Sequence, residues 1–291
     1  MRYLDPRADL TFKKVFGEHP DLVKSLLNAL LPFETPEEEI DEVEYLPAEL
    51  VPDTPLKKNS IVDVRCRDML GRQFIVEMQM LWSPAFMQRV LFNASKAYVR
   101  QLGGSVRYEL LQPVYSLNLL NDVFAPDLPD YYHDYRIVRM EHTEKVIEGL
   151  RFIFVELPKF TPSTFSHKKM HVLWLRYLTE INESTRRVSD DLLENPEIRK
   201  AVTQIEESAF SDAQLLGYDS FWDAVRVENT LVNDAMRKGL AEGIEQGMKQ
   251  GIEQGMKQGI LQTARNMKDK GIPADIISQC TGLAPDIIKG L

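Results

Sequence analysis

Apolar and polar positions alternate with two different spacings along the first 160 residues. Between residues 9 and 31, apolar residues recur three and four positions apart, which predicts helical structure with a break between Gly17 and Pro20. Further along, short and nearly continuous apolar runs predict strands. These runs lie at about 59–80, where two strands would form a hairpin, at 113–120 (PVYSLNLL), and in the segments YRIVRM and LRFIFVEL.

The segments between these strands complete the predicted fold. A helix is predicted from about 84 to 102, and the acidic, proline-bearing segment 32–57 is expected to be a loop or a weak edge strand. From about 162 to 238 the spacing of apolar residues is mostly helical. This order of elements predicts an α/β fold with a mixed sheet flanked by helices.

The C-terminal part of the chain contains a glycine repeat. Residues 243–250 and 251–258 are the same octamer, GIEQGMKQ, and glycine recurs at every fourth position from Gly239 to Gly259. Each glycine inside a helix costs about 1 kcal/mol relative to alanine, so a lone helix with this composition would be poor. An apolar residue follows each glycine, which makes a stripe that turns by about 40° per repeat around the helix. This stripe is compatible with a homo-oligomer, a semi-flexible linker helix or another partner, but its Glu, Lys and Gln residues exclude a membrane dimer.

The patterns divide the chain into four predicted parts. A core is expected at 1–160, a helical extension at 161–235, the glycine-repeat helix at 236–265 and a small helical tail at 266–291. The tail reads as two short helices about a Thr-Gly turn. It resembles a helix-turn-helix remnant, and the alternative is a small capping bundle.

Composition narrows the class of protein. With 291 residues, of which 44% are hydrophobic, the chain can form one substantial core with an appendage. No apolar run approaches the roughly 18 residues of a membrane span, and the start, MRYLDPRADL, lacks an apolar signal segment, so we expect a cytoplasmic protein. The two cysteines lie far apart in the sequence, which indicates neither a disulfide framework nor a four-ligand zinc site.

Charge is distributed unevenly along the chain. The formal net charge of -9 argues against a protein that coats nucleic acid. Nine acidic residues and no basic one lie between Glu34 and Asp53, whereas positions 78–108 hold four basic residues and no acidic one. On a helical wheel, one face of the predicted helix carries Arg89, Asn93, Lys96 and Arg100, and the opposite face carries Met87, Leu91, Ala94, Tyr98 and Leu102. The cationic face either contacts DNA phosphates or is a solvated surface.

Two carboxylates belong to the predicted hairpin. If residues 69–71 form a three-residue loop with the glycine in the left-handed conformation, Asp63 lies directly opposite Glu77. Opposed side chains have Cβ atoms about 5 Å apart, and like charges there are destabilising unless a cation lies between them. Hard oxygen ligands of this kind suit Mg²⁺ or Mn²⁺. The alternative is two polar positions of a half-solvated sheet, one of them paired with Arg65 or Arg72.

Several segments together resemble the recombination-promoting nuclease (Rpn) group of transposase-like proteins, within the PD-(D/E)XK nucleases. They are DLTFKKVFG from Asp9, IVDV from Ile61, VEMQ from Val76, VELPKF from Val155 and the glycine-repeat tail.

The resemblance implies a restriction-endonuclease-like core in which Asp63 and Glu77 are ligands of Mg²⁺ or Mn²⁺. Asp9 would support the metal or its water, and Gln79 would occupy the position that lysine holds in better-known members. Val62 replaces the proline of the superfamily name. Gln79 can orient a water or a phosphate oxygen, but it carries no positive charge.

The main hypothesis from the sequence is a metal-dependent DNA endonuclease that acts in recombination or mobile-element biology. Its catalytic residues would be Asp9, Asp63, Glu77 and Gln79, and its DNA-binding residues Arg89, Asn93, Lys96 and Arg100. One alternative is a weakly active or inactive nuclease-fold protein that works as a DNA-binding or self-association module. Another is a toxin or defence nuclease that its own tail holds in check.

Overall fold

The computed structural model describes residues 2–50, 60–102, 107–162 and 169–291. The chain forms two compact units, Met1–Val225 and Arg226–Leu291. Residues 51–59, which belong to the predicted loop and hairpin segments, lie outside the described residues.

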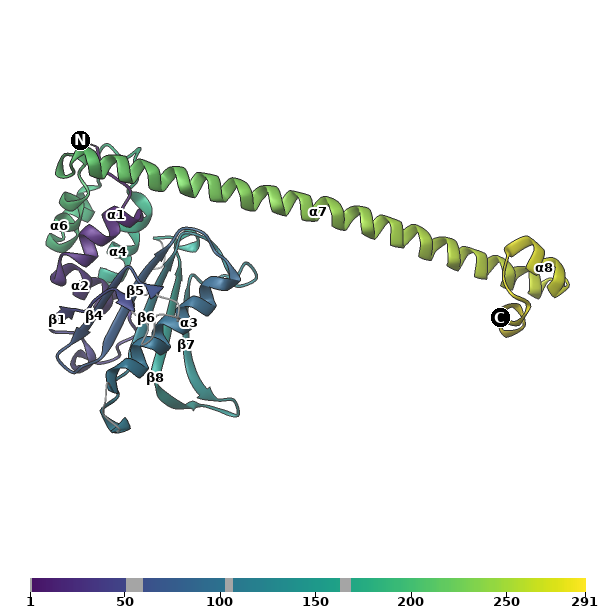
Figure 1. Ribbon diagram of the computed structural model, residues 1–291, viewed down its shortest axis with the longest axis horizontal. Coiled ribbons are helices and arrows are strands. Elements are labelled where there is room, and N and C mark those ends of the chain that lie inside the picture. Colours follow the sequence, from purple (N-terminus) through teal and green to yellow (C-terminus); the bar gives the residue numbers. More distant parts are fainter. Residues whose placement is uncertain (1, 51–59, 103–106, 163–168) are drawn as a thin grey trace. The chain divides into compact units, whose positions relative to one another are not determined.

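A six-stranded mixed sheet forms the centre of the first unit, in the order β1-β4-β5-β6-β8-β7 (Figure 1). Its strands are β1 (Val43–Tyr45), β4 (Val64–Asp68), β5 (Gln73–Gln79), β6 (Val114–Leu120), β7 (Tyr132–Arg139) and β8 (His142–Glu156). β5, β6 and β8 run parallel, and the other neighbouring strands pair antiparallel. Strands β2 (Glu49–Leu50) and β3 (Ser60–Ile61) pair separately.

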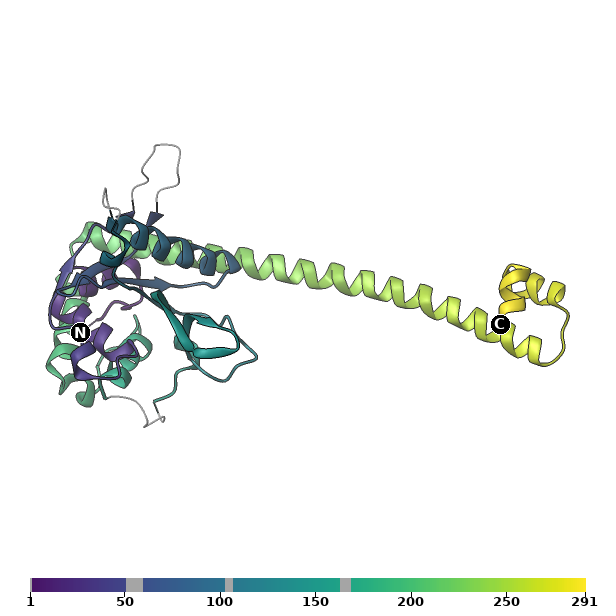
Figure 2. The same cartoon turned by 90° about the horizontal axis from the view of Figure 1, so that it is seen from below.

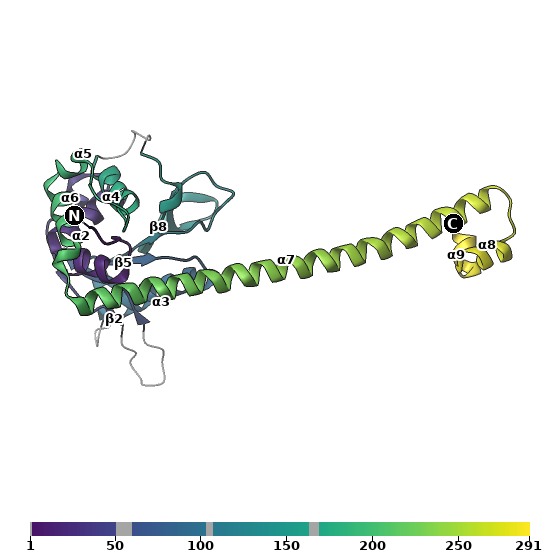
Figure 3. The same cartoon turned by 90° about the horizontal axis from the view of Figure 1, so that it is seen from above.

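Helices cover both faces of this sheet (Figures 2 and 3). The main core joins the sheet to α1 (Asp9–Phe12), the π-helical turn η1 (Lys13–Gly17), α2 (Pro20–Leu30), α4 (Lys169–Glu180), α5 (Asp190–Leu193) and α6 (Pro196–Gln204). On the other face, α3 (Pro84–Val99) packs on β5 and β6 and continues into the 3-10 turn η3 (Arg100–Leu102). The remaining short 3-10 turns are Pro36–Glu38, Tyr108–Leu110, Leu157–Lys159 and Glu207–Ala209. The predicted α/β fold is confirmed.

The β4–β5 hairpin has the predicted register. Val64 pairs with Val76, and Gly71 in the turn has a φ of 84°, a left-handed conformation that glycine adopts without strain. The carboxylate of Asp68, at the end of β4, accepts hydrogen bonds from the backbone N–H groups of Leu70 and Arg72. It also forms an ion pair with the Arg72 guanidinium, at 2.6 Å. These contacts are local in sequence, so the turn itself sets the register.

The segment VELPKF fastens the loop that follows β6. Glu156 is fully buried, and its carboxylate accepts hydrogen bonds from the backbone N–H groups of Phe124 and Ala125 and contacts His133 Nε2 and Lys159 Nζ. The Lys159 ammonium also donates to the carbonyl oxygens of Ala125 and Leu128. Loop 121–131 is therefore tied to the end of β8 by a carboxylate and an ammonium group that satisfy each other.

A single long helix, α7 (Asp212–Asp269), begins inside the predicted helical extension and includes the whole glycine repeat. Its first residues, including Tyr218, pack on Leu4 and Phe210 of the first unit. In the second unit, α8 (Ala274–Thr281) and α9 (Pro285–Gly290) meet at Gly282 and enclose a small core with the end of α7. Across the described residues, no helix combines the length and apolar character that a membrane crossing requires.

Candidate metal and DNA site

Asp63 and Glu77 lie together at one end of the hairpin. Asp63 immediately precedes β4, and extending the observed pairing by one residue sets it opposite Glu77. The Asp63 carboxylate accepts a hydrogen bond of 2.7 Å from the backbone N–H of Met78, which fixes it against β5. Glu77 is only 4% exposed. The structure thus brings two carboxylates side by side in a largely buried setting.

The Glu77 carboxylate has two partners on α3. Asn93 Nδ2 donates to Glu77 Oε1 at 3.0 Å, and the Arg89 guanidinium lies 3.6 Å from Oε2. Burial raises the pKa of Glu77, the contacts with Asn93 and Arg89 lower it in part, and the negative charge of Asp63 raises it further. The net pKa is above the ordinary value for a glutamate.

Asp63 is in a similar electrostatic state. Burial raises its pKa, the hydrogen bond from Met78 and the charge of Lys13 oppose that rise, and the charge of Asp9 adds to it. The net pKa is again above the ordinary value. Asp9, at the start of α1, is therefore close enough to act on Asp63.

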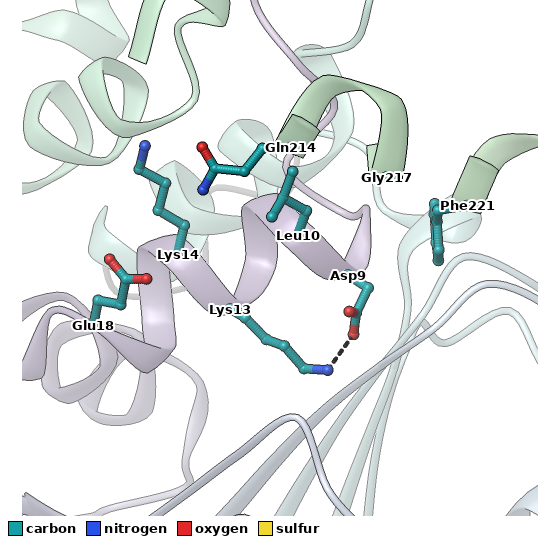
Figure 4. A pocket seen from close by; sticks show the side chains of 8 residues that line it. All are labelled: Asp9, Leu10, Lys13, Lys14, Glu18, Gln214, Gly217 and Phe221. Carbon is teal, nitrogen blue, oxygen red and sulfur yellow. Dashed lines mark ion pairs between the residues drawn. The ribbon is translucent and has the colours of Figure 1, made fainter. Parts of the chain in front are cut away.

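Asp9 faces an open cleft at the start of α1 (Figure 4). Its carboxylate forms a 2.6 Å ion pair with Lys13, one helical turn later. The cleft has a volume of about 440 Å³, and it is also lined by Leu10, Lys14, Glu18, Gln214, Gly217 and Phe221. Charged groups of both signs therefore line a space that solvent reaches, and two of them, Asp9 and Lys13, are close enough to act on Asp63.

Gln79 lies at the end of β5, on the same strand face as Glu77. Its amide nitrogen donates to the carbonyl oxygen of Leu81 at 2.8 Å, and its amide oxygen accepts a 2.7 Å hydrogen bond from Arg89 Nη2. Both ends of the amide are engaged. Arg89 therefore contacts the two residues of the VEMQ segment that the sequence placed in the site.

The prediction that Asn93 lies on the outer face of α3 is wrong. Asn93 is 1% exposed and faces the sheet, whereas Leu91, expected to be buried, is 46% exposed. The helix buries the row that contains Phe86, Val90 and Ala97, so the basic residues flank the buried side instead of opposing it. Asn93 is thereby removed from the predicted DNA-binding surface and holds Glu77. Arg89 is about half exposed and Lys96 and Arg100 are partly exposed, and their contact with DNA stays a prediction.

The carboxylate oxygens of Asp63 and Glu77 suit a hard cation that takes only a few ligands from the protein. In the described ranges, no group of three or more His, Cys, Asp or Glu side chains is arranged to hold a metal. Mg²⁺ does not require such a group, because it commonly binds through one or two carboxylates and keeps several waters. The raised pKa values of Asp63 and Glu77 mean that neighbouring cations do not fully offset the cost of their charges. A dication between them would lower that cost.

The sequence matches the model of a known protein family. The sequence model of a family described as PD-(D/E)XK nuclease family transposase matches residues 6–235. No curated protein and no solved structure matches the chain. The matched range includes Asp9, the hairpin carboxylates and α3, and it ends before the glycine repeat begins at Gly239.

Proposed function

We propose, from the premise that the chain belongs to the PD-(D/E)XK nuclease family transposases, that it is a metal-dependent DNA endonuclease of the recombination-promoting type. The observation that carries this proposal is the placement of two carboxylates with raised pKa values at one end of the hairpin: the buried Glu77 on β5 and the partly buried Asp63 just before β4. Asp9 acts on the same site from α1.

Asp63 and Glu77 would hold Mg²⁺ or Mn²⁺, with Asp9 and Gln79 close to the attacking water. The bound ion would activate that water and neutralise charge that develops on the scissile phosphate. The chain supplies the orientation: the Met78 N–H fixes the Asp63 carboxylate, and Asn93 fixes that of Glu77. Such supporting hydrogen bonds commonly change metal affinity or activity by about 10–100-fold.

DNA is the proposed substrate. Arg89 and Lys96 of α3 and Arg100 of the η3 turn that continues it lie along one flank, next to the strand that carries Glu77, and they would contact backbone phosphates. Such contacts do not depend on base sequence and weaken as salt concentration rises. A cytoplasmic location and a role in DNA recombination belong to the same proposal.

The glycine-repeat helix is the proposed site of homo-oligomer formation. The six apolar residues that follow its glycines are between 40% and 68% exposed, and they are Leu240, Ile244, Met248, Ile252, Met256 and Ile260. A continuous exposed apolar stripe of this length is typical of a surface that associates. The same stripe favours a second function, in which the protein is a self-associating DNA-binding module with little or no nuclease activity.

Cleavage of supercoiled plasmid by the purified protein tests the proposal. Reactions contain Mg²⁺, Mn²⁺ or EDTA and compare the wild type with Asp63→Ala and Glu77→Ala. A matched control is Glu44→Ala, because Glu44 is an exposed glutamate on the edge strand β1, paired with Arg67. We expect metal-dependent nicking that both site variants lose and the control keeps.

Two results would contradict the endonuclease proposal. They are an absence of nicking with either metal, and nicking that persists in both site variants. DNA binding by a wild-type protein that does not cleave, together with self-association, would support the module instead.

A further inference from the structure

Arg89 reaches from α3 into the carboxylate site. Its Nη2 lies 2.7 Å from the amide oxygen of Gln79 and 3.6 Å from Glu77 Oε2, while its guanidinium carbon lies 4.9 Å from the centre of the Phe86 ring. The side chain is about half exposed. One side of the guanidinium is therefore held by the site, and the other side faces solvent.

A phosphodiesterase site needs positive charge where the scissile phosphate gains negative charge in the transition state. Gln79, at the end of β5, is neutral and has both ends of its amide engaged, so it cannot supply that charge. Lys13 forms a 2.6 Å ion pair with Asp9. Lys96 is seven residues from Arg89 along α3, a rise of about 10 Å. Arg89 is the cation that already contacts the VEMQ segment.

We propose that Arg89 is the positively charged catalytic residue of the site and contacts the scissile phosphate, and that Gln79 is the positioning residue that holds it. This inference rests on the proposed nuclease function. A guanidinium has five N–H donors in a planar fork, so it can donate to Gln79 and still present donors to a phosphate oxygen. The contact with Glu77 is longer than the one with Gln79, so the amide is the closer anchor.

Charge relocation tests this assignment. The variants are Arg89→Ala, Arg89→Lys and the double variant Gln79→Lys with Arg89→Ala, which moves the positive charge onto β5. Arg67→Ala is the matched control, because Arg67 is also about half exposed and paired with a glutamate, yet it lies on the hairpin strand away from α3. Measurements are kcat and KM for plasmid nicking with Mn²⁺, DNA affinity in EDTA, and Mn²⁺ affinity by calorimetry without DNA.

Arg89→Ala is expected to lower kcat by about 100-fold, the usual effect of removing one donor to a developing oxyanion. DNA affinity in EDTA should fall by less than about fivefold, since one of several phosphate contacts is lost. Mn²⁺ affinity should be unchanged or higher, because a cation beside Glu77 has been removed. Arg89→Lys should keep part of kcat, and the double variant should recover at least tenfold over Arg89→Ala.

Three results would overturn the assignment while the nuclease function stands. They are a normal kcat with a raised KM in Arg89→Ala, a fall in Mn²⁺ affinity that matches the loss of kcat, and no recovery in the double variant. In the first case Arg89 only steers DNA, and in the second it only shapes the metal site. A wild-type protein that does not nick DNA under any metal would remove the proposed function and this inference together.

Discussion

Asp63 and Glu77 are expected to destabilise the protein when no metal is bound. The test is Asp63→Asn, which removes one negative charge but keeps an oxygen that can accept the hydrogen bond from Met78. The variant should therefore unfold at a higher temperature than the wild type in EDTA, even though it has lost a proposed metal ligand.

The size of the effect follows from the separation of the two groups. Opposed residues of an antiparallel pair have Cβ atoms about 5 Å apart, and two unit charges at that distance repel by roughly 3 kcal/mol at an effective dielectric constant of about 20. Lys13 and Arg89 lower the pKa of Asp63 and so offset part of this repulsion. We expect a net gain of about 1–2 kcal/mol, which corresponds to a rise in Tm of about 2–8 °C in a unit of 225 residues.

The effect has a definite dependence on pH. Because the folded-state pKa of Asp63 is raised, the folded protein binds protons more tightly than the unfolded chain between the two pKa values. The contribution of Asp63 to wild-type stability is therefore fully present below about pH 4, the unfolded pKa of an aspartate, and is lost as pH rises through the folded pKa. The advantage of Asp63→Asn should appear over the same interval and grow as pH rises.

Thermal unfolding at pH 4 and pH 7, with EDTA or Mn²⁺, measures this difference. Asp68→Asn is the matched control from the same hairpin, since Asp68 is paired with the buried Arg72 and its change should cost about 3–5 kcal/mol. With Mn²⁺ at 100 times its Kd, the wild type should gain about 2.7 kcal/mol and overtake Asp63→Asn. A lower Tm for Asp63→Asn than for the wild type in EDTA at pH 7 would refute the reasoning.

Two further predictions concern other parts of the chain. Glu156→Gln should destabilise the protein at pH 7 by about 3–5 kcal/mol because it replaces a fully buried carboxylate and leaves the partly buried Lys159 beside a neutral partner. The folded pKa of Glu156 is lowered, since the contacts with Lys159, Ala125, His133 and Phe124 outweigh burial. Wild-type stability from this group is thus present above about pH 4.3 and lost as pH falls, and urea unfolding at several pH values should show that the variant lacks this loss. The double variant Gly247→Ala with Gly251→Ala should have a higher helix content by circular dichroism, because an added Cβ meets nothing within 4 Å at either position. It should also self-associate more weakly in sedimentation equilibrium if the glycines face a second copy. Unchanged association would place the contact elsewhere.

The parts of the structure that the sequence predicted are those that depend on near neighbours. The register of β4 and β5 follows from Asp68 and Gly71 within the turn, and the apolar runs locate the remaining core strands. The order of strands in the sheet was not predicted. β8 lies between β6 and β7, which places the last strand of the chain inside the sheet, and only contacts between distant residues determine that position.

The structure rotates α3 away from the orientation that the sequence predicts, and the cause is a competition between two apolar rows. The row that contains Met87 and Leu91 and the row that contains Phe86 and Val90 have the same helical spacing. The structure buries the second row, where Ala94 and Ala97 let the helix lie close to Ile75 and Val114. Asn93 then becomes buried, and a buried amide requires a partner. Glu77 is that partner.

The same rotation accounts for the contacts of Arg89. Arg89 and Asn93 are four residues apart on α3, a rise of about 6 Å along one helical row. Glu77 and Gln79 are two residues apart on one face of β5, a rise of about 6.6 Å. The two pairs therefore match in spacing, and Asn93 meets Glu77 while Arg89 meets Gln79. A helix turned to present Leu91 to the sheet would separate both pairs. The orientation of α3 is therefore what brings the positive charge of Arg89 to the end of β5, where the strand's own residue, Gln79, is neutral.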